Sequence, residues 1–107
     1  MDKNVIVIST SLRSGSNSQR LAEAFAKGAG EAGNRVEVIS LRGKKFGFCT
    51  GCLSCQKTFH CFMKDDAEEI SEKIGAADVV AFATPVYYYG MSGQMKALLD
   101  RCNPLFP

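Results

Sequence analysis

Residues 5–18 read Val-Ile-Val-Ile-Ser-Thr-Ser-Leu-Arg-Ser-Gly-Ser-Asn-Ser. The run 5–8 is apolar and β-branched at every position, which is typical of a strand buried on both faces of a parallel sheet. A polar segment follows, and Ser16 with Gln19 has the spacing of a capping box at a helix start. Unpaired backbone N–H groups at a helix start favour an anion. The stretch therefore predicts a strand, an anion-binding turn and a helix.

The rest of the chain continues this alternation of strands and helices. Residues 35–39 alternate in polarity, which favours an edge strand, whereas residues 79–83 are apolar throughout and predict a second buried strand. Further helices are expected after Asp65 or Asp66 and after Ser92, and residues 42–63 have no clean period and predict a long loop. Because crossover connections are right-handed, these units predict an α/β fold with a parallel sheet of strand order 2-1-3.

Each expected helix has an apolar stripe that should face the sheet. We expect the first helix to end at Gly33-Asn34, since glycine is common just past a helix end. The stripes comprise Leu21, Ala22, Phe25, Ala26 and Ala29 in the first helix, Ala67, Ile70, Ile74 and Ala77 in the second, and Met91, Met95, Leu98, Leu99 and Cys102 in the third.

Composition restricts the classes of protein to consider. The 107 residues suffice for one domain, residues 1–107, and 46% are hydrophobic, so a soluble domain with a core is expected. A net charge of +2 gives no argument for nucleic acid or a membrane surface. Apolar runs are too short for a bilayer, and the N-terminus lacks a signal-peptide pattern. A cytoplasmic location is the default expectation.

Two motifs carry a resemblance to known families. The turn Ser11-x-Arg13-x-x-Ser16-Asn17-Ser18, and the segment Thr84-Pro85-Val86-Tyr87-Tyr88-Tyr89-Gly90 after the third strand, resemble the NADPH-dependent FMN reductase and iron-sulfur flavoprotein families. The resemblance implies a flavodoxin-like three-layer α-β-α fold that binds FMN beyond the carboxyl ends of the strands. It implies that the FMN phosphate is held by Ser11, Arg13, Ser16, Asn17 and Ser18, and the isoalloxazine ring by Pro85, Val86, Tyr87, Tyr88 and Gly90.

Physical chemistry supports the ring site independently. A proline-rigid turn with aromatic side chains and a glycine that permits close approach suits a flat amphipathic ring. The alternative is that the three tyrosines belong to the core or to an interface.

The sequence also contains a compact cysteine motif, Cys49-x2-Cys52-x2-Cys55-x5-Cys61. Four thiolates at this spacing suit an iron–sulfur cluster or structural zinc, and free or redox-active thiols are a third possibility. The resemblance to iron-sulfur flavoproteins implies a [4Fe-4S] cluster that passes electrons to FMN. Cys102 stands apart in a helical pattern and is expected to be a small buried hydrophobe.

The fold expected from the resemblance is longer than this sequence. Strands 4 and 5 of a flavodoxin-like sheet are missing, and residues 103–107 form an apolar tail. A free edge beside residues 79–83 favours self-association, so a homo-oligomer is expected.

These features predict an oxidoreductase in which FMN carries the chemistry, with NAD(P)H as the hydride donor and no side-chain acid or base nominated. The first alternative is an iron-sulfur flavoprotein that exchanges single electrons with a ferredoxin-like partner. The second is an inactive or assembly-dependent fragment.

Overall fold

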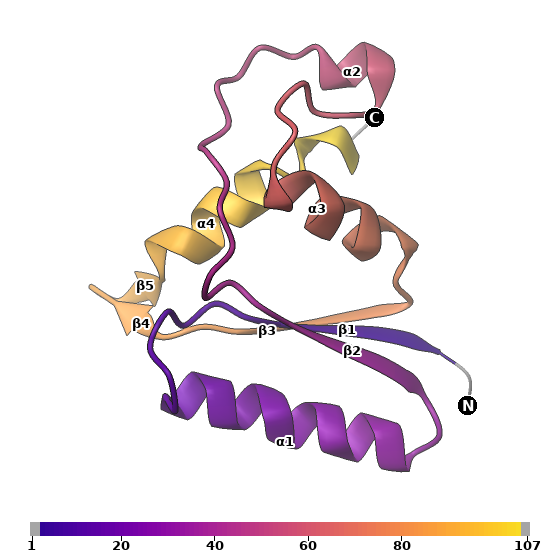
Figure 1. Ribbon diagram of the computed structural model, residues 1–107, viewed down its shortest axis with the longest axis vertical. Coiled ribbons are helices and arrows are strands. Elements are labelled where there is room, and N and C mark those ends of the chain that lie inside the picture. Colours follow the sequence, from indigo (N-terminus) through magenta and orange to yellow (C-terminus); the bar gives the residue numbers. More distant parts are fainter. Residues whose placement is uncertain (1–2, 106–107) are drawn as a thin grey trace.

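The structure is a computed structural model that describes residues 3–105 (Figure 1). The last two residues of the apolar tail predicted from the sequence lie outside this range. The elements in chain order are β1 (Asn4–Ser9), α1 (Asn17–Glu31), β2 (Arg35–Ser40), α2 (Cys55–Thr58), α3 (Asp66–Ala76), β3 (Val79–Ala83), β4 (Val86–Tyr87), β5 (Gly90–Met91), α4 (Gly93–Asp100) and the short 3₁₀ helix η1 (Asn103–Leu105).

The main sheet has three parallel strands in the order β2-β1-β3, as the sequence predicts. Val5 is in register with Val36 of β2 on one side and with Val79 of β3 on the other. β1 is therefore the central strand, and the loops that follow β1 and β3 leave the same edge of the sheet.

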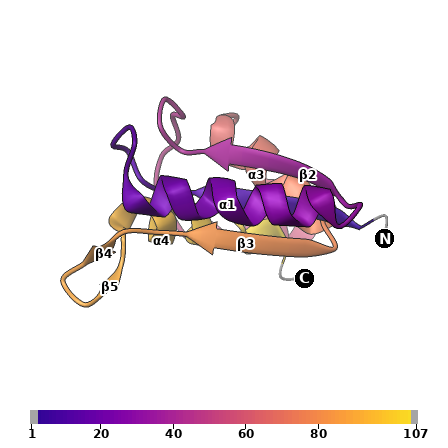
Figure 2. The ribbon, with the colours of Figure 1, turned by 90° about the horizontal axis from the view of Figure 1, so that it is seen from below.

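Helices cover both faces of this sheet, which gives the expected three layers. α1 lies on one face, and α3 and α4 lie on the other (Figure 1). Seen from the α1 side, α1 runs along β1 between the two outer strands (Figure 2). The side chains of β1 alternate between the layers: Val5 and Val7 pack with Ala22 of α1, whereas Ile6 and Ile8 pack in the larger core that includes Ile70 and Leu98.

The apolar stripe predicted for α1 is partly wrong. Ala22 is buried and Ala26 and Ala29 pack against the sheet, but Leu21 is 68% exposed and Phe25 is 47% exposed. The small alanine side chains let the helix approach the sheet, and positions one residue earlier lie about 100° around the helix. The larger side chains are thereby turned away from the three-stranded sheet.

Four further features differ from the expectations. The 42–63 segment contains the four-residue helix α2, and the segment after β3 forms the two-stranded hairpin β4–β5. β3 is half-buried instead of fully buried, since within residues 3–105 it pairs on one side only, with β1. Met91 is 44% exposed in β5 and is not part of the inward face of α4. None of the described helices is long and apolar enough to cross a membrane.

Candidate functional site

The turn between β1 and α1 is built as a helix-capping loop. The Ser16 hydroxyl caps α1 by accepting a hydrogen bond of 3.2 Å from the backbone N–H of Gln19. The Gln19 side chain turns to Ser9 and Glu23 instead of completing the reciprocal half of the capping box. Gly15 has a φ of +70°, a left-handed conformation that favours glycine. The capped turn therefore lies directly against the N-terminal end of α1.

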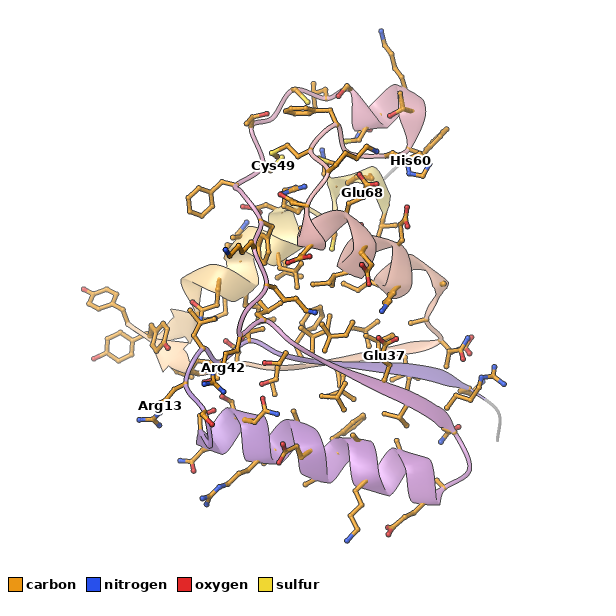
Figure 3. The ribbon with its side chains drawn as sticks, viewed as in Figure 1. Arg13, Glu37, Arg42, Cys49, His60 and Glu68 are labelled. Atoms are coloured by element: carbon orange, nitrogen blue, oxygen red, sulfur yellow. The ribbon has the colours of Figure 1, made fainter. Side chains whose placement is uncertain are left out.

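A cavity of about 660 Å³ opens beside this turn. Three arginines line it: Arg13 from the turn, Arg20 from α1, and Arg42 from the loop after β2; Glu23 is the one acidic lining residue. Arg13 and Arg42 both lie at the end of the sheet where β1 leads into α1 (Figure 3). A cationic cavity at a helix N-terminus suits a phosphate group. Its full lining is Ser11, Arg13, Ser14, Gly15, Gln19, Arg20, Glu23, Ser40, Arg42 and Gly43.

The five residues expected at the phosphate divide into three groups. Ser11 and Arg13 line the cavity. Ser16 and Ser18 are buried, their hydroxyl oxygens lie 3.3 Å apart, and neither lines the cavity. Asn17 is exposed as the first residue of α1. Three serines of the motif therefore build the turn, because Ser11 is also buried and its hydroxyl bonds the Arg13 backbone, while the exposed Arg13 faces the open space.

Of the five residues expected at the ring, Pro85 directly precedes β4 and the other four lie on the β4–β5 hairpin beyond β3 (Figure 2). Tyr88 and Tyr89 form its two-residue loop, with φ of +49° and +65°. Positive φ at both positions is typical of a type I′ turn, which normally takes asparagine or glycine. Each tyrosine is 96% exposed, and their rings meet edge-on with centroids 5.6 Å apart. Strained, exposed aromatic residues are characteristic of binding sites.

The rest of this segment is also accessible. Val86, Tyr87 and Gly90 are exposed and Pro85 is half-buried. Apart from Gly90 and its two chain neighbours, no atom of residues 3–105 lies within 4 Å of the position that a Cβ on Gly90 would take. The hairpin therefore presents an open aromatic surface.

A buried hydrogen-bond network joins the two loops. Ser92, the N-cap of α4, is fully buried, and its hydroxyl lies 3.2 Å from that of Thr10 and 3.1 Å from that of Thr84. The Gln94 side chain donates to the Thr10 carbonyl at 2.8 Å. The turn after β1 and the segment after β3 are thus held together at one edge of the sheet.

The four cysteines of the motif all line one small cavity of about 20 Å³, which is also lined by Asp100, Arg101, Asn103 and Pro104. Cys49 and Cys52 are exposed, Cys61 is half-buried, and Cys55 is buried. Cys49 lies far from Arg13, beyond α3 and α4 (Figure 3). The Asn103 side-chain amide donates to the Cys55 sulfur at 3.5 Å.

The four thiols are not arranged as a metal site in this structure. In the part of the chain that the structure describes, no three cysteine, histidine or acidic side chains are close enough to hold one metal ion. In a four-iron cluster each thiolate binds a separate iron, so the ligands surround a shared space. This space is smaller than a cluster. Binding one would therefore require the cysteine segment to rearrange.

Arg101 closes the base of the cysteine segment. Its guanidinium donates two hydrogen bonds of 2.8 Å to the carboxylate of Asp65, the N-cap of α3. It also donates to the carbonyls of Gly47, at 2.9 Å, and Met63, at 3.4 Å. One buried side chain of α4 therefore holds both ends of the segment 48–62.

Local contacts shift the pKa values around this segment. Partial burial raises the pKa of Asp65, but hydrogen bonds from Arg101 and from the Gly47 and Ala67 amides outweigh it, and the net pKa is below the ordinary value. The Ser54 hydroxyl, 3.1 Å from the Cys52 sulfur, lowers the pKa of that thiol. Burial raises the pKa of Cys102, as expected for a packed thiol.

Sequence reasoning missed several of these residues. Ser40 ends β2, Arg42 follows it, and neither belongs to a motif, but parallel strands end at the same edge, and this rule could have placed them beside the turn. Ser92 was expected at a helix start, but its contact with Thr10, and that of Gln94 with Thr10, arise only through long-range packing that no local signal predicts. The same holds for the pair of Asp65 and Arg101, which are 36 positions apart.

The known proteins that resemble this chain include iron-sulfur flavoproteins and an FMN reductase. An iron-sulfur flavoprotein of Methanocaldococcus jannaschii is 39% identical over 101 residues, which is 94% of this chain and 52% of that protein. An iron-sulfur flavoprotein of Methanosarcina thermophila is 35% identical over 94 residues, covering 88% of this chain and 49% of the relative. An NAD(P)H-dependent FMN reductase of Pseudomonas aeruginosa is 36% identical over 100 residues, covering 92% and 49%. The chain spans about half the length of the curated relatives it matches.

Among solved structures, an NAD(P)H:quinone oxidoreductase of Methanothermobacter marburgensis superposes with a TM-score of 0.75 at 24% identity, covering 95% of this chain and 54% of that one. This likeness shows the flavodoxin-like fold. The sequence model described as NADPH-dependent FMN reductase matches residues 3–106. The chain belongs to the NADPH-dependent FMN reductase family.

Proposed function

We propose that this chain binds FMN at the edge of the sheet where β1 and β3 end. The phosphate is assigned to the turn of Ser11, Arg13, Ser16, Asn17 and Ser18, with Arg42 as an added contact. The observation that carries the proposal is the cavity of about 660 Å³ at the start of α1, lined by three arginines and one glutamate. A phosphate monoester carries close to two negative charges at neutral pH, which this lining complements.

The isoalloxazine ring is assigned to the segment of Pro85, Val86, Tyr87, Tyr88 and Gly90. Its support is the exposed aromatic hairpin and the open space beside Gly90. The network of Thr10, Thr84 and Ser92 supports a single site, because it ties this segment to the phosphate turn. A rigid connection between the two loops fixes the distance between the places where the two ends of one ligand would bind.

The proposed activity is electron transfer from NAD(P)H to an acceptor. Bound FMN supplies the chemistry, since a flavin accepts hydride from a nicotinamide. The residues of this chain bind and orient the flavin, and none is assigned as an acid or base. The family membership and the likeness to an FMN reductase support this activity.

A steady-state assay of the full chain with FMN tests the activity. We expect NADH or NADPH oxidation that depends on FMN and saturates with it. A protein that binds FMN but never oxidises either nicotinamide would contradict the reductase assignment. A protein that binds no flavin in any oligomeric state would favour an inactive or assembly-dependent fragment.

A second candidate is an electron carrier with a [4Fe-4S] cluster on Cys49, Cys52, Cys55 and Cys61. It is favoured by the convergence of all four thiols on one cavity and by the likeness to iron-sulfur flavoproteins. Its partner would be a ferredoxin-like protein, and a homo-oligomer is proposed for either activity. Iron and acid-labile sulfide in anaerobically purified protein, with reduction by ferredoxin but not by NAD(P)H, would support this carrier. Absence of both elements would remove it.

A further inference from the structure

The two outer strands of the sheet differ in how their free edges are protected. Within residues 3–105, β3 pairs only with β1, and its five residues, 79–83, are all apolar, with no charge or proline among them. The other outer strand, β2, carries Arg35 and Glu37, and charged side chains discourage edge-to-edge pairing. The sheet is therefore open to a further strand at β3 and protected at β2.

The side of α1 that lies above β3 is apolar as well. Arg20 and Glu23 line a cavity together with Ser40 of β2, so their side of the helix faces β2. Leu21 and Phe25 each precede a sheet-facing alanine by one residue, which places them about 100° around the helix in the other direction, toward β3 (Figure 2). The helix therefore continues the apolar surface of the β3 edge.

This surface combines large side chains on the helix with small ones on the strand. Leu21 is 68% exposed and Phe25 is 47% exposed, whereas the strand residues that face the α1 layer include Ala81 and Ala83. The space beside the helix and above the edge of β3 is therefore open. Large apolar side chains that reach over the edge of a second sheet would fill it.

A second copy of the same surface fits this space. If a two-fold axis perpendicular to the sheet passes beside β3, the two β3 strands run antiparallel and both α1 helices lie on the same face. Because α1 lies over β1, the two helices are three strand spacings apart, about 14 Å. Helices in direct contact lie about 8–10 Å apart, so the remaining gap suits Leu21 and Phe25 from both copies.

The distribution of charge also favours a second copy. A two-fold axis brings each residue near its own counterpart, so a charged surface would oppose like charges. Neither β3 nor the β3 side of α1 carries a charge. The charged residues of α1 lie on its β2 side or on its outer face, and they are Arg20, Glu23, Lys27 and Glu31.

We propose that a second copy of this chain docks on this surface. The β3 strands of the two copies pair antiparallel about Ala81 and join two three-stranded sheets into one, and Leu21 and Phe25 of both copies pack above the junction. Because the contact is isologous, it closes at a dimer. The inference rests on the homo-oligomer part of the proposed function and involves neither a flavin nor a cluster.

Sedimentation equilibrium of the flavin-free full chain measures the dimer and its dissociation constant. Phe25→Lys and Leu21→Lys each place like charges on both sides of the junction, at positions that are exposed in a single copy. Loss of this apolar contact should weaken dimerisation at least about tenfold. Val38→Lys is the control, since Val38 is 40% exposed on β2, and this variant should dimerise like the wild type.

A mixing experiment tests the two-fold symmetry itself. Phe25→Glu alone should dimerise as weakly as Phe25→Lys, but an equimolar mixture of the two should dimerise more tightly than either, because opposite charges then meet at the axis. Amide hydrogen exchange of residues 79–83 in the wild type should slow as the protein concentration rises, because the paired edge protects their N–H groups.

Several outcomes would overturn the inference. These are a wild-type chain that stays monomeric at the highest concentration, assemblies larger than a dimer, dimerisation that neither lysine variant weakens, and a mixture that binds no better than its components. If a variant does not fold by circular dichroism, the hydrogen exchange of residues 79–83 decides. FMN affinity is measured separately, so a dimer that binds no FMN removes only the flavin proposal, and a monomer that binds FMN removes only this one.

Discussion

At the scale of single residues, Arg13 and Arg42 are the most informative positions of the candidate flavin site. They come from different elements and line the same cavity at the start of α1. A hydrogen bond to a charged group is worth about 1.5–3 kcal/mol, so Arg13→Gln or Arg42→Gln should weaken FMN binding about ten- to a hundredfold. Titration followed by flavin fluorescence measures this loss.

Riboflavin and a matched variant are the controls for this prediction. Riboflavin lacks the phosphate, so its affinity should not change in either arginine variant. Lys27→Gln, which removes a charge from α1 away from the cavity, should bind FMN like the wild type. Equal losses for FMN and riboflavin would show that the arginines support the fold and do not contact a phosphate.

The sequence predicts site residues where local chemistry marks them. Ser11 and Arg13 stand in a motif, and both line the cavity. Arg42 was missed because only the parallel packing of β2 beside β1 brings it there. The role of Arg101 was missed for a similar reason: in sequence it is one of several polar residues at a helix end, and burial gives it its importance.

At the scale of elements, the cap of α1 determines how the phosphate turn is held. Ser16 caps the helix, so Ser16→Ala in the flavin-free chain should lower the free energy of unfolding by about 1 kcal/mol. Urea denaturation measures it. Ser54→Ala is the matched control, because Ser54 precedes α2 without a side-chain cap bond. Equal losses of unfolding free energy in the two variants would mean that the Ser16 cap does not stabilise the turn.

Periodicity predicted the three main strands and the three longer helices, because burial on a sheet imposes a regular apolar pattern. Periodicity failed where the packing of the folded chain, and not the local pattern, determines which residues are buried and where the chain turns. Leu21 and Phe25 have the spacing of a core stripe, but the helix packs through its alanines. The β4–β5 hairpin was missed because Tyr88 and Tyr89 occupy positive-φ positions that sequence rules reserve for glycine and asparagine.

At the scale of the whole molecule, the pair of Asp65 and Arg101 links α3, α4 and both ends of the cysteine segment. The pKa of Asp65 is lowered in the folded chain, so its contribution to stability is complete above its unfolded pKa and is lost as the pH falls through the folded value. The free energy of unfolding should therefore fall below about pH 4 more steeply in the wild type than in Asp65→Asn. Denaturant titrations at several pH values measure it; parallel curves would contradict the shift.

The central claim is that the cavity at the start of α1 holds the phosphate of FMN. The most direct measurement is the affinity of the wild-type chain for FMN and for riboflavin, at low and at high salt. The account predicts that FMN binds more tightly, and that added salt reduces the difference by screening the arginines. Equal affinities for the two flavins at both salt concentrations, or no binding of FMN, would contradict it.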